Sequence, residues 1–230
     1  LLQRAEEVFQ VPADIIVAII GVETFYGTRM GTFPVLDTLV TLGFDYPPRS
    51  AFFRGQLEEF LLLSREQDIP PQEPKGSYAA AMGMGQFISS SYRDFAVDFD
   101  GNGHIDLWKS TADGIGSVAN YFRRHDWIMG AAVVAPAYVE GDQYVSLKAN
   151  ERKPSYSVQQ LKAAGVQPSV PVATEEALSF LDLKGAKGQE FWLGHHNFYV
   201  ITRYNHSVKY ALAVYQLSQA IKRTRLARRS

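Results

Sequence analysis

The chain has 230 residues, of which 46% are hydrophobic and 20% are charged, so it can bury a sizeable core as one large domain or as a core with a smaller appendage. Its net charge of −1 provides no global positive field and argues against a nucleic-acid-binding protein. The lack of cysteine excludes disulfide bonds, thiolate metal sites and a cysteine nucleophile. The apolar run at 15–20 is far too short to span a bilayer.

Two helices are predicted at the start of the chain. Residues 1–10 show an amphipathic pattern, and 12–27 form an apolar stretch that Pro12 suits as a first turn and Gly27 suits as an end. In the second helix, Glu23 follows three isoleucines at the spacing i, i+3, i+4 and i+7, namely Ile16, Ile19 and Ile20. An acidic side chain is therefore expected on an otherwise apolar face.

Glu23 supports two interpretations. A carboxyl group on an apolar face is partly desolvated, which raises its pKa and leaves it protonated near neutral pH, as a general acid requires. The alternative is a structural glutamate that faces solvent or pairs with a basic neighbour, here Arg29. This helix alone leaves both open.

The next elements are a loop-rich segment at 32–48 and a strongly periodic helix at 50–66, which a proline-rich linker closes off. In 76–96, small residues alternate with methionine, glutamine and phenylalanine. Gly83 and Gly85 indicate a backbone that a ligand approaches closely, or else tight packing against another helix.

The stretch DFDGNGHIDLW at 98–108 has the spacing of a calcium-binding EF-hand loop. The expected ligands are the side chains of Asp98, Asp100 and Asn102 and the carbonyl of His104, with Asp113 in place of the usual glutamate at position 12. The alternative is a solvated turn rich in Asp and Asn. A single loop of this kind favours a structural Ca²⁺ rather than a sensor.

The second half of the chain changes in character. After a helix at 113–124, short apolar runs at 131–139, 142–147, 169–172, 177–183 and 189–194 predict strands of an antiparallel sheet, with a small helix at 158–164. A continuous helix is expected at 197–225. Its basic end is interpreted as a solvated helix terminus, with contact to an anionic envelope surface as the alternative; it contains Lys222, Arg223, Arg225, Arg228 and Arg229.

Five stretches taken together resemble a known family. They are IIGVETFYG at 19–27, GSYAAAMGMGQF at 76–87, DFDGNGHIDLW at 98–108, GSVANYF at 116–122 and NFYVITRYNHS at 197–207. In this order, over almost the whole chain, they resemble the B-type lytic transglycosylases, which are periplasmic peptidoglycan-cleaving enzymes. The resemblance favours the catalytic interpretation of Glu23.

The resemblance implies an α+β fold that is mainly helical: a lysozyme-like core at 1–125 with an EF-hand-like loop at 98–113, an inserted antiparallel β subdomain at 126–194, and a C-terminal helix at 195–230 that returns to the core. It implies Glu23 as the only catalytic acid and the same metal ligands as the spacing does. The residues that it implies for the saccharide cleft are Ser77, Gln86, Tyr121, Tyr204, Asn205 and Tyr210.

The expected reaction is non-hydrolytic cleavage of the MurNAc–GlcNAc bond, in which Glu23 acts first as acid and then as base. A hydrolytic muramidase and a non-catalytic calcium-dependent wall-binding module are the alternatives. We expect Ca²⁺ but no organic cofactor, a monomer bound to peptidoglycan glycan strands, other cell-wall enzymes as further candidate partners, and no nucleic acid. The expected location is the periplasm, with or without an outer-membrane anchor on a segment before Leu1.

Overall fold

The computed structural model describes residues 1–186 and 188–228. The chain divides after Arg124 into two compact units, residues 1–124 and 125–230, called here the N-terminal and C-terminal units. This boundary lies within one residue of the expected end of the helical core. The C-terminal helices belong to the same unit as the sheet, and their expected return to the helical core stays a prediction.

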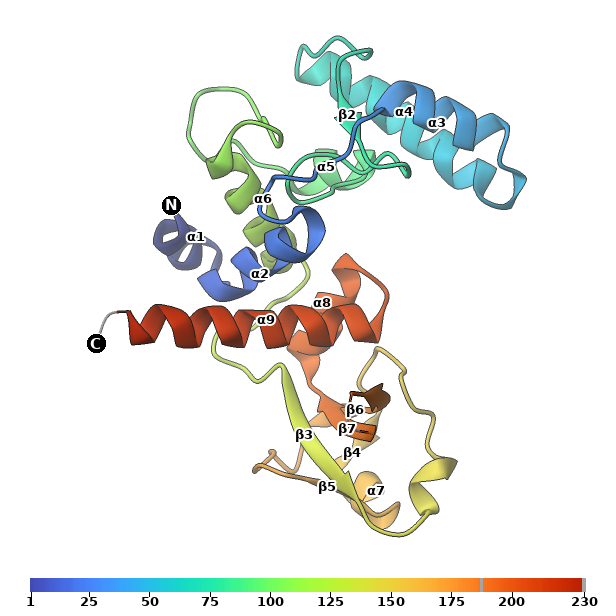
Figure 1. Ribbon diagram of the computed structural model, residues 1–230, viewed down its shortest axis with the longest axis vertical. Helices are drawn as coiled ribbons and strands as arrows, with labels where there is room; N and C mark the ends of the chain where they lie inside the picture. Colours follow the sequence, from blue (N-terminus) through green and yellow to red (C-terminus); the bar gives the residue numbers. More distant parts are fainter. Residues whose placement is uncertain (187, 229–230) are drawn as a thin grey trace. The chain divides into compact units, whose positions relative to one another are not determined.

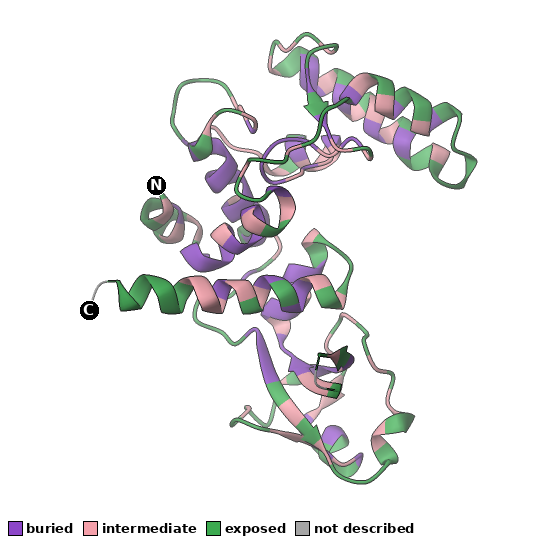
Figure 2. Cartoon of the chain, in the orientation of Figure 1, coloured by how far each residue is buried: buried purple, intermediate pink, exposed green. Residues whose placement is uncertain are grey.

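The N-terminal unit is mainly helical (Figure 1). Its elements are α1 (Leu2–Phe9), α2 (Ala13–Thr24), β1 (Phe33–Pro34), α3 (Val35–Phe44), the 3₁₀ turn η1 (Pro47–Arg49), α4 (Ser50–Glu66), β2 (Lys75–Gly76), α5 (Ser89–Phe95) and α6 (Thr111–Arg124). Helices α2 and α6 contact each other and supply much of its buried apolar surface (Figure 2). The buried faces include Ile16 and Ile19 on α2 and Val118 and Phe122 on α6.

The C-terminal unit combines an antiparallel sheet with helices. Its elements are β3 (Val134–Val139), η2 (Gln143–Ser146), β4 (Tyr156–Ser157), α7 (Val158–Ala163), β5 (Val166–Pro168), β6 (Ala177–Gly185), β7 (Gly188–Gly194), α8 (His196–Tyr204) and α9 (Val208–Ala227). The strand order is β4-β6-β7-β3-β5, and side chains of β3, β5, β6, β7 and α7 form a buried apolar cluster. The expected antiparallel sheet and the short helix expected at 158–164, observed as α7 between β4 and β5, are therefore confirmed.

One expected loop contains a helix. Within 32–48, α3 begins directly after Pro34, whose backbone angles (φ −59°, ψ 124°) resemble those of Pro12 before α2 (φ −58°, ψ 134°). Val35 and Leu39 lie one turn apart and are both buried. The expectation of a loop was wrong because the prolines mark the start of a helix, where a missing N–H costs nothing, rather than its absence.

The expected helix at 197–225 is two helices. The chain breaks between α8 and α9, where the Asn205 side chain accepts the N–H of Ser207 at 3.1 Å and the Ser207 hydroxyl accepts the N–H of Tyr210 at 3.3 Å. Ser207 is therefore the N-cap of α9, in agreement with the preference of serine for that position. Apolar periodicity continues on both sides of the break and conceals it in the sequence.

Two expected strands are also wrong. Residues 142–147 contain the 3₁₀ turn η2, closed by local bonds such as the Leu147 N–H to the Tyr144 carbonyl at 3.0 Å. At 169–172, the strand β5 has already ended at Pro168, and only the Ser169 N–H extends its pairing, to the Pro136 carbonyl at 2.8 Å. Pro171 lacks the N–H that further pairing with β3 would need.

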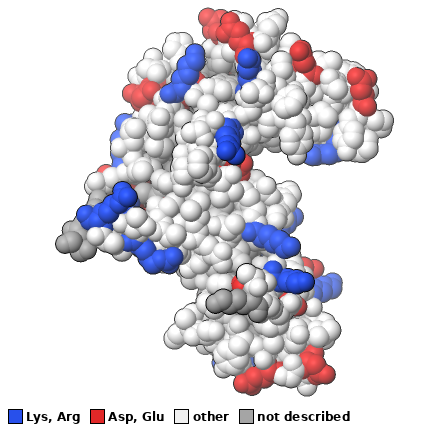
Figure 3. Space-filling view, in the orientation of Figure 1, with Lys and Arg blue, Asp and Glu red and all other residues white. Residues whose placement is uncertain are grey.

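Charges of both signs are distributed over the face shown in Figure 3, and neither sign covers it. None of the helices in the described part of the chain combines the length and the apolar character that crossing a bilayer requires. Arg229, the last residue of the expected basic end, lies outside the described residues.

Candidate functional site

Glu23 lies in the last turn of α2 and is half-buried. The three isoleucines that precede it on the same stripe are buried, as their spacing predicts. Directly after Thr24 the backbone turns left-handed for three residues, with φ of 50° at Phe25, 60° at Tyr26 and 82° at Gly27. The helix therefore ends abruptly, immediately beyond the acid. The guanidinium of Arg29 lies over the ring of Phe25, with Cζ 5.6 Å from the centroid.

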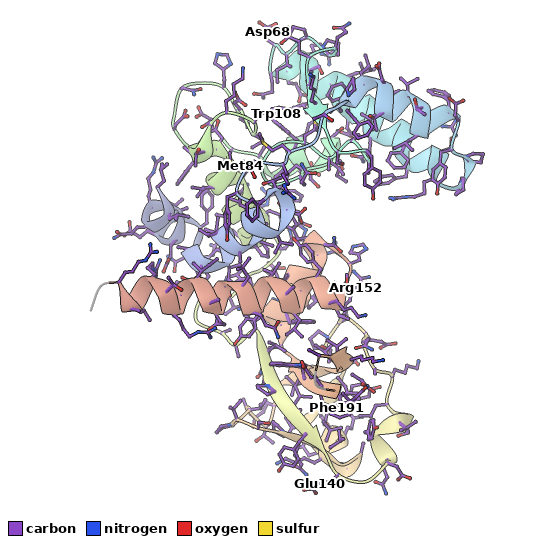
Figure 4. All side chains as sticks on the ribbon, viewed as in Figure 1. Asp68, Met84, Trp108, Glu140, Arg152 and Phe191 are labelled. Carbon is purple, nitrogen blue, oxygen red and sulfur yellow. The ribbon has the colours of Figure 1, made fainter. Side chains whose placement is uncertain are left out.

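Thr24 attaches this end of α2 to the 76–87 loop. Its hydroxyl donates to the Met84 carbonyl at 2.8 Å, lies 3.2 Å from the Ile20 carbonyl, and accepts the N–H of Gly27 at 2.9 Å. Only 1% of Thr24 is exposed, so these bonds are protected from water. Met84, labelled in Figure 4, lies beside both α2 and α6, since a Cβ on Gly114 of α6 would meet its sulfur. The position of Glu23 is thus fixed by its immediate neighbour in sequence.

Ser77 and Gln86 stabilise the 76–87 loop from within. The Ser77 hydroxyl oxygen accepts the N–H groups of Ala79 at 3.2 Å and Ala81 at 3.1 Å. The Gln86 amide nitrogen donates to the carbonyls of Gly83 at 3.0 Å and Met30 at 3.2 Å. Gln86 therefore also holds the segment that follows α2. Both side chains are half-buried, and their expected contact with a saccharide stays a prediction.

The expected aromatic residues have different environments. Tyr121 on α6 is only 8% exposed and packs its ring edge-on against Phe95 at 4.9 Å and obliquely against Phe87 at 6.0 Å. Its ring is part of the core of the N-terminal unit. Tyr204 and Tyr210 are half-buried in the C-terminal unit, at the end of α8 and in the first turn of α9.

The expected metal ligands gather in the N-terminal unit. Ligand oxygens of Asp98, Asp100 and Asp113 all lie within 4.8 Å of one another, which is about twice a Ca²⁺–oxygen distance of about 2.4 Å. The other two expected ligands belong to the same loop, where the N–H of His104 donates to the Asn102 side chain at 2.8 Å. Three carboxylates so close together repel one another unless a cation lies among them, so these residues fit Ca²⁺.

Hydrogen bonds fix the conformation of this loop. Asp98 accepts the N–H groups of Gly101 at 2.7 Å, Asn102 at 3.1 Å and Gly103 at 2.7 Å. These bonds, with that from Gly103 the largest effect, hold the pKa of Asp98 below its usual value, so its carboxylate is charged and ready for a cation.

Asp113 occupies the first turn of α6 and is fully buried. Its two carboxylate oxygens accept the N–H of Phe99 at 2.8 Å and the N–H of Asp106 at 2.9 Å, one from each arm of the loop. The helix dipole favours an anion at this position. Asp113 therefore joins both arms of the loop, and its expected role as the ligand at position 12 stays a prediction.

The family model described as the Transglycosylase SLT domain matches residues 1–219. The chain belongs to the transglycosylase SLT domain family. It is 49% identical over 225 residues to membrane-bound lytic murein transglycosylase B of Escherichia coli, covering 98% of this chain and 61% of that protein. The chain thus spans about three fifths of the length of this family member.

Two solved structures of related proteins extend this comparison. The E. coli lytic transglycosylase Slt35 in complex with calcium is 48% identical, with a TM-score of 0.91, over 98% of this chain and 70% of that one. SltB3 from Pseudomonas aeruginosa, in complex with NAG-NAM-pentapeptide, is 35% identical, with a TM-score of 0.84, over 96% of this chain and 59% of that one. The mainly helical fold with a small antiparallel sheet is thus that of SLT domain proteins.

Proposed function

We propose that the chain is a lytic transglycosylase that cleaves the β-1,4 bond between MurNAc and GlcNAc in peptidoglycan and releases 1,6-anhydro-muropeptides. The observation that carries this proposal is Glu23, a half-buried acid at the end of α2 that Thr24 anchors to the 76–87 loop, in a member of the SLT domain family. A general acid must hold a proton that it can donate to the leaving oxygen, and the carboxyl group of Glu23 is the proposed donor.

In the proposed mechanism one carboxyl group carries the proton in both steps. Glu23 first donates its proton to the glycosidic oxygen, and the C1–O bond breaks with its electron pair going to that oxygen. The 2-acetamido oxygen of the sugar attacks C1, as in other substrate-assisted glycosidases. The Glu23 carboxylate then takes the proton of the C6 hydroxyl, whose oxygen displaces the acetamido oxygen from C1. Glu23 ends protonated, and no water is added.

The remaining residues are assigned to binding. We propose that Ser77, Gln86 and Tyr121 in the N-terminal unit, and Tyr204, Asn205 and Tyr210 in the C-terminal unit, contact the glycan. The amide nitrogen of Gln86 contacts two backbone carbonyls, which supports a role for its carbonyl oxygen as the acceptor of a sugar hydroxyl. Of the three tyrosines, the half-buried Tyr204 and Tyr210 are the ones suited to offer both a flat face and a hydroxyl to a sugar.

Calcium is proposed as a structural ion, held by Asp98, Asp100, Asn102, the His104 carbonyl and Asp113. The calcium complex of Slt35 supports this assignment, as does the gathering of three of the carboxylates. When bound, the ion supplies positive charge that stabilises the loop, and it takes no part in bond cleavage. We further propose that the protein acts in the periplasm, on peptidoglycan, as a monomer.

Glu23→Gln tests the proposed mechanism. The amide keeps the shape of the side chain but cannot transfer the proton, so turnover of purified peptidoglycan should fall by at least about 10²-fold while binding survives. Glu58→Gln, an exposed residue on α4, is the matched control. Mass spectrometry separates the candidate functions, because anhydro products are one water lighter than hydrolytic ones and a binding module releases neither. Near-normal release of anhydro-muropeptides by Glu23→Gln would contradict the proposal.

A further inference from the structure

A loop of the C-terminal unit, residues 148–155, is fixed to β6 near both of its ends. The Asn150 N–H donates to the Phe180 carbonyl at 2.8 Å, and the Asn150 side chain donates to the Asp182 carbonyl at 2.9 Å. At the other end, the Ser155 N–H donates to the Leu178 carbonyl at 3.1 Å. The loop contains Arg152, labelled in Figure 4. The backbone that carries the Arg152 side chain therefore has a defined conformation.

The guanidinium of Arg152 has an unused hydrogen-bond donor. Its Nη1 atom is buried and, in the part of the chain that the structure describes, has no hydrogen-bond partner. A buried donor without a partner destabilises the protein, and does so more strongly when it is charged. The neighbouring acid, Glu151, is exposed. A guanidinium of this kind is suited to a carboxylate, whose two oxygens match its planar donors.

Arg203 and His206 lie in the same region of the C-terminal unit as Arg152. The charges of Arg152 and Arg203 both act on His206, in the connection between α8 and α9. Partial desolvation, and then these two positive charges, lower the pKa of the His206 imidazole. Positive charge therefore accumulates beside Asn205, where the glycan is proposed to bind.

We infer that Arg152, with Arg203 beside it, binds a carboxylate of the peptide stem attached to the glycan. This inference rests on the proposed function, because the peptide stem is the part of peptidoglycan that carries several carboxylates. The complex of SltB3 with a NAG-NAM-pentapeptide shows that a related protein accommodates such a stem. Arg152 thus makes the protein distinguish stem-bearing glycan from bare glycan.

Arg152→Gln tests this inference directly. The ligand is GlcNAc–MurNAc-pentapeptide, which lacks the MurNAc–GlcNAc bond and so binds without being cleaved. Calorimetry should show a Kd about tenfold higher for Arg152→Gln than for the wild type, the scale of a hydrogen bond to a charged group. Lys153→Gln, which removes the adjacent exposed cation, should leave Kd unchanged. Equal losses in both variants, or none in Arg152→Gln, would overturn the inference.

Binding of two more ligands shows which part of the substrate carries the carboxylate that Arg152 contacts. GlcNAc–MurNAc without a peptide keeps only its lactyl carboxylate, and a chitooligosaccharide has none. The inference requires that Arg152→Gln bind both as the wild type does. A weakened contact with the peptide-free disaccharide would assign Arg152 to the lactyl group, and weakened binding of the chitooligosaccharide would assign it to the sugar; either would refute a stem site.

A chemical variant of the ligand tests the same contact without relying on the mutant fold. If the pentapeptide carboxylates are amidated, the wild type should bind about tenfold more weakly, whereas the same amidation should weaken binding to Arg152→Gln far less. Equal binding of the two ligands by the wild type would overturn the inference. All these measurements are of binding alone, so a failure of the proposed cleavage reaction would be visible separately, as the absence of anhydro products.

Discussion

At the scale of single residues, the hydroxyl of Thr24 connects the proposed acid to the rest of the site. Glu23 belongs to a helix end, and helix ends fray unless they are capped or packed. The bonds of Thr24 to Met84 and Gly27 join the last turn of α2 to a loop 60 residues away in sequence. Thr24 is therefore a positioning residue, which acts through Glu23 rather than on a substrate.

Thr24→Val should impair both stability and turnover. Valine fills the same space but leaves the Met84 carbonyl and the Gly27 N–H without their partner, so the free energy of unfolding should fall by about 1–3 kcal/mol. Turnover should fall by up to about 10²-fold, the cost of a misplaced catalytic group. Thr24→Ser should restore both. Thr28→Val, which removes a solvent-exposed bond to the Phe25 carbonyl, should change both far less. Normal turnover in a destabilised Thr24→Val protein would assign Thr24 a purely structural role.

The sequence reveals some site residues and conceals others. Asp98 and Asp100 can be found because their proposed ligand role depends on spacing within one loop, and Glu23 can be found because it interrupts an apolar stripe. Thr24 and Arg152 cannot be found in this way. The hydrogen-bond partner of Thr24 lies 60 residues away in sequence, and Arg152 differs from other arginines only in a buried donor without a partner, which the sequence does not show. The hydroxyl bonds of Ser77 and the buried ring of Tyr121 likewise depend on tertiary contacts.

At the scale of elements, the 76–87 loop lies directly against residues 98–113, the proposed calcium-binding loop, called here the metal loop. The Met84 N–H donates to the Leu107 carbonyl at 2.9 Å, and the Tyr92 hydroxyl donates to the Ile105 carbonyl at 2.6 Å. Burial raises the pKa of Tyr92, so its phenol stays a donor at physiological pH. The metal loop therefore supports the same backbone segment that Thr24 contacts.

Gly83→Ala tests this contact. Gly83 has φ of 68°, and a Cβ there would lie 2.5 Å from the Cβ of Leu107. Gly130, with φ of 79° and open space around it, is the matched control. Gly130→Ala should cost about 1–2 kcal/mol of unfolding free energy from backbone strain alone. Gly83→Ala should cost about 1–3 kcal/mol more, as overpacking does. Chemical denaturation measures the free energy of unfolding of both variants. An equal decrease in the two would show that Leu107 moves aside at no cost.

Elements were predictable where local pattern and tertiary packing agree. The helix α4, Ser50–Glu66, was expected with its observed bounds because its periodicity is long and prolines follow it. The break between α8 and α9 could not be expected, since side-chain caps decide it while the apolar period continues. The 3₁₀ turn η2 was mistaken for a strand because a short apolar run has no distinguishing period.

At the scale of the whole molecule, the proposed calcium ion belongs to one unit. Among residues 1–186 and 188–228, the only group of three or more acidic or histidine side chains placed to share a cation is that of Asp98, Asp100 and Asp113. Binding of an ion to the folded loop stabilises every conformation that keeps the loop intact. Its effect on unit 125–230 depends on whether the two units open together.

Hydrogen exchange with and without Ca²⁺ measures this dependence. Because Asp113 joins the loop to α6 and Leu107 joins it to the 76–87 loop, Ca²⁺ should slow amide exchange in residues 83–87 and 97–114. The strands β6 and β7 should exchange at unchanged rates if the units open separately. The control is Asp98→Asn, which removes a ligand charge but keeps an acceptor oxygen, and in which Ca²⁺ should slow exchange far less. Equal slowing in β6 and β7 would show that both units unfold as one cooperative body, and no slowing anywhere would refute the metal site itself.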